Sequence, residues 1–224
     1  MATPFLNPAA PATGLPLGTA TPGPLRLGIT GGIGSGKSLV GRMLATMGAP
    51  FYSADQRARY LMEQEPELVA GILALFGPEA YLPTGQLDRA FLAQAAFADP
   101  ARTQRLNALV HPAVEADYER WASQPRPGVP YTVKEAALLF EAGTYRRVHF
   151  VLAVLAPEPV RIARTLARDP HRSQAQVERI IGLQMPEAEL QARSHLWLYN
   201  DDAQPVLPQA EAIHAWLYAM GQDR

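Results

Sequence analysis

The sequence contains no cysteine among its 224 residues, and its formal net charge at pH 7 is only -1. The lack of cysteine excludes disulfides, thiolate metal ligands and cysteine nucleophiles. The small net charge gives no overall attraction to nucleic acid or to a membrane, so neither is expected as a partner. No apolar run approaches the roughly 20 residues of a membrane-spanning helix. Hydrophobic residues make up 48%, which is enough to form a core and excludes a chain disordered throughout.

The first 24 residues lack charge altogether and contain six prolines. A secretory signal would need a basic start and a continuous apolar segment, and prolines interrupt this stretch. We therefore expect a disordered Pro-rich extension over 1–24, a single domain over 25–224 and a cytoplasmic location. The sequence narrows the oligomeric state only to a monomer or a weak homo-oligomer.

Short apolar runs alternate with helical patterns along most of the chain. Strands are predicted over 25–30, 49–53, 131–137, 148–155 and 197–200. Helices are predicted over 38–47, 159–167, 173–184 and 209–220. The stretch 56–121 is mostly helical, with breaks at Pro66, Gly77-Pro78, Pro83-Thr84-Gly85, Asp99-Pro100 and His111-Pro112. Strands alternating with helices predict an α/β fold with a parallel sheet covered on both faces.

The segment Gly31–Ser38 has a Gly-x4-Gly-Lys-Ser pattern between a predicted strand and a predicted helix. Its glycines let successive backbone N–H groups point at phosphate oxygens, and the helix N-terminus adds positive charge. Lys37 is expected to reach the β- and γ-phosphates, and Ser38 to bind Mg²⁺. The predicted ATP contacts are Gly32, Ile33, Gly34, Ser35, Gly36, Lys37, Ser38 and Leu39. An ordinary Gly-rich turn is the alternative, and the loop predicts a nucleotide site without naming a reaction.

Two carboxylates follow predicted strands, Asp55 after the second and Glu135 at the end of the third. Ligands of open parallel sheets bind outside the carboxyl ends of the strands, so both are expected in the crevice of the phosphate loop. Asp55 can accept a hydroxyl proton during phosphoryl transfer or hold a Mg²⁺-bound water, and it can also cap the helix beginning near Gln56. Glu135 is a candidate to hold a Mg²⁺-bound water, with an ion pair or a cap as the alternative.

Arginines recur at Arg161, Arg164 and Arg168, a spacing that places them on one face of a predicted helix. Arg172 and Arg179 follow. Phosphoryl transfer needs cations to neutralise the migrating group, so an arginine-rich segment over about 157–186 suits a mobile lid. For any single arginine the alternative is a solvated helix face.

Six further segments occur in an order that belongs to one enzyme family. They are Ser53-Ala54-Asp55 with Ala58-Arg59, Phe97–Pro100, Leu106–Pro112, Ala137–Glu141, Arg168-Asp169 and Asn200-Asp201. Together with the phosphate loop, these segments resemble the dephospho-CoA kinase family from about Leu25 to Asp201. The chain has Ser53 where the family carries aspartate, and Ala137 where proline is usual.

The resemblance implies a P-loop kinase fold with a helical acceptor-binding region over about 56–121 and a lid over about 157–186. It implies transfer of the ATP γ-phosphoryl group to the ribose 3′-hydroxyl of dephospho-CoA, with Mg²⁺ as cofactor. Under this interpretation the catalytic residues are Asp55, Lys37 and Arg168, and Arg168 and Asn200 also contact ATP. The acceptor contacts are Asp55, Arg59, His111, Leu138 and Leu139. For His111 a structural role at a helix end is the alternative.

Two other functions stay open from the sequence. One is a related kinase of another small acceptor, such as a nucleoside monophosphate. The other is a non-catalytic ATP-binding module, although Asp55 and the arginine cluster argue against it, because binding alone needs neither. A GTPase is disfavoured, since the sequence has no Asn-Lys-x-Asp motif to read guanine.

Overall fold

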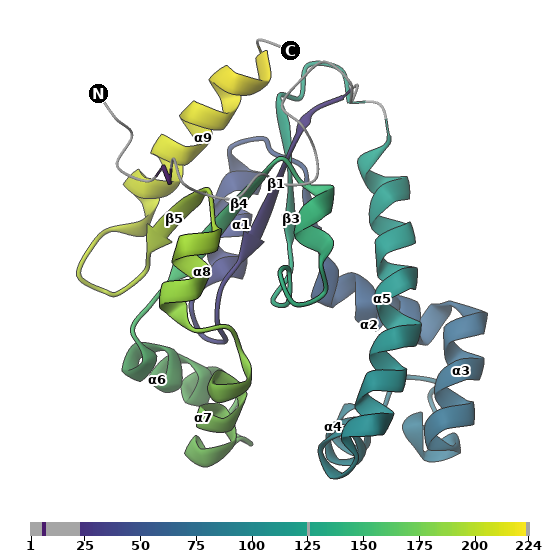
Figure 1. Ribbon diagram of the computed structural model, residues 1–224. Helices are drawn as coiled ribbons and strands as arrows, with labels where there is room; N and C mark the ends of the chain where they lie inside the picture. Colours follow the sequence, from purple (N-terminus) through teal and green to yellow (C-terminus); the bar gives the residue numbers. More distant parts are fainter. Residues whose placement is uncertain (1–5, 8–22, 125, 223–224) are drawn as a thin grey trace. The chain divides into compact units, whose positions relative to one another are not determined.

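The computed structural model describes residues 6–7, 23–124 and 126–222. The chain divides into two compact units. The sheet unit combines Met1–Ser53 with Pro125–Arg224, and the helical unit is Ala54–Gln124. No helix of the described residues is both long and apolar enough to cross a membrane. Figure 1 shows the elements of both units.

The sheet unit is built on five parallel strands in the order β2-β3-β1-β4-β5 (Figure 1). The strands are β1 (Leu25–Thr30), β2 (Phe51–Ser53), β3 (Tyr131–Glu135), β4 (Phe150–Leu155) and β5 (Leu196–Tyr199). The predicted α/β fold with a parallel sheet is thereby confirmed. Because β1 lies between β3 and β4, the strand order reverses beside it, and its carboxyl end is a switch point where such sheets bind ligands.

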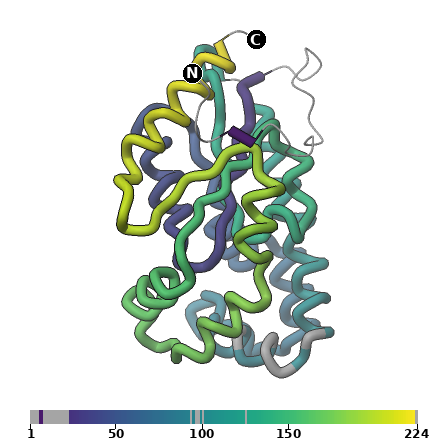
Figure 2. The backbone as a smooth tube through the Cα atoms, turned by 60° about the vertical axis from the view of Figure 1, so that its left-hand side comes forward, coloured from purple at the N-terminus to yellow at the C-terminus, as the bar shows by residue number. Residues whose placement is uncertain are grey.

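Helices cover the sheet within this unit. They are α1 (Lys37–Thr46), α6 (Glu158–Arg168), α7 (Gln174–Leu183), α8 (Glu187–Arg193) and α9 (Val206–Gln222), with a short 3₁₀ turn η2 (Thr144–Arg147). Helices α1 and α9 contact each other, while α8 contacts β4 and lies in front of the sheet in Figure 1. Figure 2 follows the chain from β4 through α6, α7 and α8 back to β5. We call the segment α6–α7 the arm.

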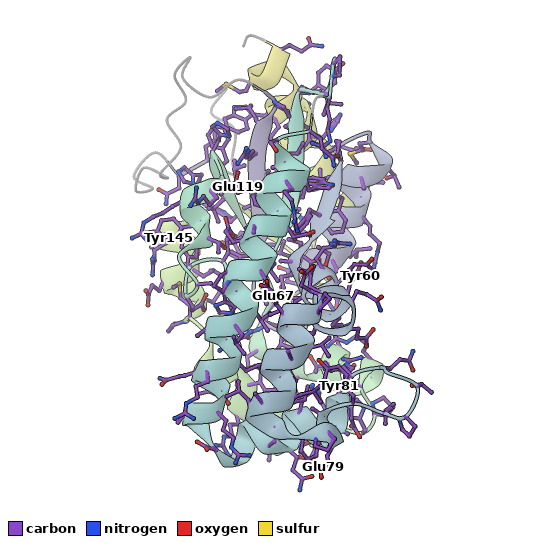
Figure 3. All side chains as sticks on the ribbon, turned by 90° about the vertical axis from the view of Figure 1, so that its right-hand side faces the viewer. Tyr60, Glu67, Glu79, Tyr81, Glu119 and Tyr145 are labelled. Carbon is purple, nitrogen blue, oxygen red and sulfur yellow. The ribbon has the colours of Figure 1, made fainter. Side chains whose placement is uncertain are left out.

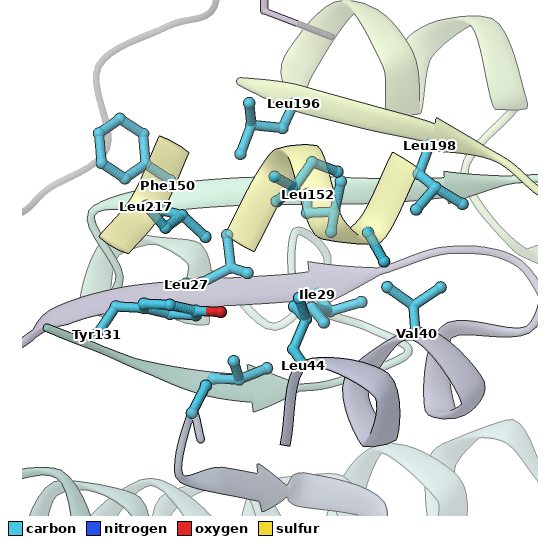
Figure 4. Packing of buried hydrophobic residues seen from close by; sticks show 14 of the residues in the cluster. Leu27, Ile29, Val40, Leu44, Tyr131, Phe150, Leu152, Leu196, Leu198 and Leu217 are labelled. Carbon is cyan, nitrogen blue, oxygen red and sulfur yellow. The ribbon is translucent and has the colours of Figure 1, made fainter. Parts of the chain in front are cut away.

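The main core lies between the sheet and helices α1 and α9. Leu27 and Ile29 of β1, Val40 of α1 and Leu217 of α9 are fully buried there (Figure 4). Successive strand residues point to opposite faces, so alternate residues of β1 and β4 reach this core. Each fully buried aliphatic side chain stabilises the fold by about 1.5–3 kcal/mol. Because both β1 and α1 contribute such side chains, the two elements that flank the phosphate loop are held firmly in place.

Two residues of the N-terminal region pair with the edge strand. Leu6 forms an antiparallel bridge with Leu196, and the Asn7 side chain donates to the carbonyl oxygens of Ala192 and Ser194 at 3.0 and 3.1 Å. The rest of the predicted disordered extension over 1–24, apart from residues 23 and 24, lies outside the described residues.

The helical unit consists of α2 (Ala54–Gln64), α3 (Pro66–Phe76), η1 (Pro78–Ala80), α4 (Arg89–Ala98) and α5 (Pro100–Ala122). Helices α3 and α5 lie side by side in Figure 3, where Glu67 on α3 and Glu119 on α5 are labelled. Asp99 caps α5 by accepting the N–H groups of Ala101 and Arg102, and Pro100 takes the first helical position. The predicted break at Asp99-Pro100 is therefore confirmed.

The predicted break at His111-Pro112 is wrong, because α5 runs through Pro112. A proline inside a helix removes one backbone hydrogen bond and costs about 3 kcal/mol. Here Val110 and Val114 on either side are buried, at 7% and 9% exposure. Packing of the flanking turns outweighs the local preference of proline.

Candidate functional site

The loop from Gly31 to Ser38 connects β1 to α1, as the motif predicted. Gly34 and Gly36 have φ angles of 77° and 92°, which only glycine adopts readily. Space is equally restrictive, because a Cβ on Gly34 would lie 2.3 Å from the carbonyl oxygen of Arg161. On Gly36 it would lie 2.1 Å from Nδ2 of Asn200. The loop therefore closely contacts residues far away in the sequence.

Two side chains hold the loop backbone from outside. The N–H of Ile33 donates to Oε1 of Gln184 at 2.8 Å, and Nδ2 of Asn200 donates to the carbonyl oxygen of Ser35 at 2.8 Å. Gln184 ends helix α7, and Asn200 is a buried residue directly after β5. Asn200 was predicted from its family-like segment. Gln184 was not predicted, because no local pattern points to it and it lies 151 residues from its partner.

Arg164 of the arm holds the turn that carries Asn200. Its Nη1 donates to the carbonyl oxygen of Asn200 at 2.9 Å, and Nη2 donates to Oδ1 of the same residue at 3.1 Å. Nη2 also pairs with Asp202 at 2.5 Å. Arg164 therefore fixes the orientation of the amide that reaches the loop.

The Glu135 carboxylate joins the loop to the end of β2. The hydroxyl of Ser38 donates to Oε1 of Glu135, and the hydroxyl of Ser53 donates to Oε2 at 3.1 Å. Glu135 and Ser53 are buried, at 3% and 7% exposure. Lys37 lies at the start of α1, and its Nζ is 3.4 Å from the carbonyl oxygen of Gly32. The predicted residues Lys37, Ser38 and Glu135 thus lie at one end of the sheet.

This set of oxygen atoms fits a hard divalent cation. Mg²⁺ typically binds one or two protein oxygens and takes further ligands from phosphates and water. Ser38 and Glu135 present a hydroxyl and a carboxylate side by side. Among the described residues no group of three or more His, Cys, Asp or Glu side chains could hold a metal. A metal at this point would therefore depend on phosphate oxygens from a nucleotide.

The end of α6 carries a cluster of opposite charges. Asp169 accepts from Nη2 and Nε of Arg168 at 2.8 and 3.1 Å, and Nε of Arg172 lies 3.4 Å from the same carboxylate. The hydrogen bond from Arg168 lowers the pKa of Asp169, and the pKa of Arg168 is raised by the same bond. The Arg168 side chain is 63% exposed, so its guanidinium remains accessible to a ligand.

The helical unit carries three of the predicted acceptor residues. Asp55 and Arg59 are exposed on α2. The interpretation of Asp55 as a helix cap is wrong, because α2 begins one residue earlier, at Ala54. Arg57 binds Asp117 of α5 through two hydrogen bonds of 2.7 and 2.8 Å, which anchors the first turn of α2. His111 of α5 is half-buried, and burial lowers its pKa.

The two leucines predicted as acceptor contacts differ in exposure. Both belong to the sheet unit and follow β3. Leu138 is 40% exposed, whereas Leu139 is fully buried and packs against Gly28 of β1. Only Leu138 therefore presents a side chain to a ligand in this structure.

Comparisons with known proteins cover nearly the whole described chain. The family model described as dephospho-CoA kinase matches residues 25–205. A Salinibacter ruber relative named dephospho-CoA kinase is 41% identical over 88% of this chain and 98% of its own. A Chlorobaculum tepidum relative with the same name is 40% identical over 80% of this chain and 87% of its own.

Solved structures show the same fold. A crystal structure of a Thermus thermophilus protein is 37% identical, with a TM-score of 0.72 over 88% of this chain and 97% of that one. The structure of a dephospho-CoA kinase from Campylobacter jejuni is 19% identical, with a TM-score of 0.58 over 89% of this chain and 98% of that one. With the family model covering most of the sequence, the chain belongs to the dephospho-CoA kinase family.

Proposed function

We propose that this chain transfers the γ-phosphoryl group of ATP to the ribose 3′-hydroxyl of dephospho-CoA, giving CoA and ADP. The observation that supports this most is the similarity to relatives named dephospho-CoA kinase, one of which is 41% identical over 88% of this chain and 98% of its own length. The site fits the chemistry, since a phosphate loop, an adjacent carboxylate and an arginine-rich arm are what a phosphoryl-transfer enzyme requires.

The nucleotide is held by the phosphate loop. Backbone N–H groups from Gly34 to Ser38 and the start of α1 bind the β- and γ-phosphates, because glycine at positive φ turns those groups inward. Lys37 extends along the phosphates, and Asn200 lies on the side of the loop where we place the adenine. The N–H of Ile33 already donates to Gln184, so its role is to anchor the loop.

Ser38 would hold Mg²⁺ directly and Glu135 would hold one of its bound waters. When bound, the ion neutralises the phosphate oxygens that gain charge as the phosphoryl group leaves. The Ser53 hydroxyl, at the position where the family carries aspartate, donates to Glu135 and orients its carboxylate. In this chain a serine therefore supports the carboxylate, and Glu135 supplies the negative charge.

Asp55 is proposed as the group that accepts the proton of the 3′-hydroxyl. As the hydroxyl oxygen bonds to the γ-phosphorus, the bond from that phosphorus to the β,γ-bridging oxygen breaks and ADP leaves with the electron pair. Asp55 is exposed and follows β2 by two residues, so its carboxylate is accessible to solvent. Arg59, His111 and Leu138 are proposed to contact the acceptor.

The arm supplies Arg168, whose exposed guanidinium would neutralise the migrating phosphoryl group. Asp169 holds it in the resting state through two hydrogen bonds. A carboxylate partner of this kind keeps a flexible cation in position until phosphate replaces it. Closing of the part of the arm beyond Arg168 over the phosphates would exclude water, which would otherwise hydrolyse ATP.

The Asp55→Asn variant tests the base. We expect an unchanged ATP affinity and a kcat lowered by roughly 10²–10⁴-fold, the usual loss for a general base. Coupled ADP release with dephospho-CoA measures kcat, and calorimetry measures ATP binding. The Lys37→Ala variant is the contrasting control, because it should weaken ATP binding and also abolish turnover. Near-normal turnover of Asp55→Asn would remove Asp55 from this role.

The same assay separates the alternative functions. ADP release that requires dephospho-CoA supports the proposal, and release that requires a nucleoside monophosphate instead would assign a related kinase. Release without any acceptor would indicate an ATPase, and ATP binding without release a binding module. Chelation of divalent cations should stop turnover in the first two cases.

A further inference from the structure

Arg161 is a buried cation directly beside the phosphate loop. It lies on α6, is 9% exposed, and its Nε has no hydrogen-bond partner among the described residues. Its guanidinium lies against Gly32, because a Cβ on that glycine would be only 2.0 Å from Nη1. The nearby oxygen of Gln184 already accepts the N–H of Ile33. Arg161 is therefore largely buried beside the loop, and in the described part of the chain its Nε has no hydrogen-bonded polar group to offset the charge.

The backbone of Arg161 is fixed at this position. Thr165 donates its hydroxyl to the carbonyl oxygen of Arg161 at 2.7 Å, and that oxygen lies where a side chain of Gly34 would be. Helix α6 is therefore packed tightly against the loop. Arg161 cannot move away without disturbing the loop that we assign to the phosphates.

A buried charge is costly unless an opposite charge lies close to it. No carboxylate pairs with Arg161 within the residues that the structure describes. The loop that contains Gly32 has the form that binds phosphate oxygens, which carry several negative charges in a nucleoside di- or triphosphate. In a medium of low dielectric constant a fixed cation near that site acts strongly and needs no rearrangement when the anion binds.

We propose that Arg161 is a fixed cation beside the phosphate loop that strengthens binding of the β- and γ-phosphates. It acts through the loop as a positioning residue and touches no reacting atom. Its ligands are nucleoside di- and triphosphates, and the inference rests on the nucleotide-binding part of the proposed function. It differs from Arg168, which is exposed and paired with a carboxylate.

The Arg161→Met variant separates the charge from the packing. Methionine keeps an unbranched apolar side chain beside Gly32 but removes the cation. We expect about tenfold weaker binding of ATP and of ADP, a loss of 1.4 kcal/mol. AMP has neither a β- nor a γ-phosphate, so its affinity should fall by less than about threefold. The melting temperature without ligand should stay unchanged or rise, because an uncompensated buried charge has been removed.

Two further variants complete the test. Arg161→Lys restores the charge and should return the ADP affinity to within about threefold of the original chain. Arg42→Met removes an exposed cation of α1 and should leave nucleotide affinity unchanged, which excludes a general effect of net charge. All affinities are measured by calorimetry on the full chain, with the unaltered chain's own ATP binding as the reference.

The outcomes are distinct. The proposal is supported if Arg161→Met binds ATP and ADP more weakly without a lower melting temperature, and if Arg161→Lys restores the affinity. Unchanged ADP affinity in Arg161→Met overturns it. A parallel loss of melting temperature and of affinity for all three nucleotides also overturns it, since that pattern indicates packing. If the unaltered chain binds ATP but transfers no phosphate to dephospho-CoA, the proposed reaction is wrong. The binding measurements still test the role of Arg161 in that case, because they do not depend on the transfer.

Discussion

At the scale of single residues, the phosphate loop shows how much a local motif can predict. The Gly-x4-Gly-Lys-Ser spacing predicts the turn, the following helix and the roles of Lys37 and Ser38, because all of these depend on neighbouring residues. It does not predict Gln184 or Asn200, which contact the loop from 151 and 165 residues away. Asn200 was predicted only from its family-like segment, and the contact of Gln184 follows from the packing of α7, which no short pattern in the sequence encodes.

Gly34 is the position of the phosphate loop where we expect an added methyl group to impair ATP binding most. Its φ of 77° disfavours other residues by about 1–2 kcal/mol, and the added Cβ would lie 2.3 Å from a backbone oxygen that cannot yield. We expect Gly34→Ala to abolish measurable ATP binding in calorimetry. ATP binding at the original strength would show that the loop does not need this conformation.

The matched control for Gly34→Ala is Gly182→Ala. Gly182 lies inside α7, and an added Cβ would meet nothing within 4 Å. The same chemical change should therefore raise stability by about 0.5–1 kcal/mol, since alanine favours the helix, and should leave ATP affinity unchanged.

At the scale of elements, helices and strands with strong apolar periodicity were predicted correctly, whereas predictions from isolated residues were less successful. All five strands and the helices with clear apolar stripes are present. Helix α8 was not predicted, because seven residues carry too little periodicity to be recognised. The predicted helix break at Pro112 was wrong for the opposite reason. Proline is a strong local helix breaker, but the packing of α5 overcomes this preference. Both errors arise where tertiary contacts, rather than local preference, decide the backbone.

His195 links several elements and should make their stability depend on pH. Its Nδ1 accepts the N–H of Val151 in β4 at 3.2 Å, and its own carbonyl accepts from Asn7. Burial lowers the pKa of His195, so its unfolded form binds a proton first as the pH falls. This contribution to stability is complete above the unfolded pKa of about 6.5 and is lost as the pH falls below it.

We expect urea unfolding at pH 7.5 and pH 5.5 to show a smaller free energy of unfolding at the lower pH. In His195→Gln the amide oxygen can still accept from Val151 but cannot be protonated, so the pH dependence should become flatter. An identical pH dependence in the two proteins would show that other groups, such as His111, cause the effect.

At the scale of the whole molecule, the two substrates are expected to use different units. The phosphate loop, the arm and Asn200 all belong to the sheet unit, whereas Asp55, Arg59 and His111 belong to the helical unit. The sequence predicted a mostly helical stretch over 56–121 within a single domain, and the resemblance to the family implies that this stretch binds the acceptor. It could not predict that Leu139 is buried, since exposure depends on what packs against the chain. The chain passes from one unit to the other at two points, directly after Ser53 and near residue 125.

This division predicts two separate patterns of backbone hydrogen exchange in the full chain. A non-hydrolysable ATP analogue should protect residues 31–38 and the arm, because bound phosphates order the loop that Gln184 and Asn200 hold. CoA, as the acceptor-side ligand, should add protection in α2 and α5. Glu135→Gln, which weakens the proposed metal site, should reduce the first pattern and leave the second unchanged. If the ATP analogue alone protected α5 as strongly as CoA does, the two substrates would not be divided between the units.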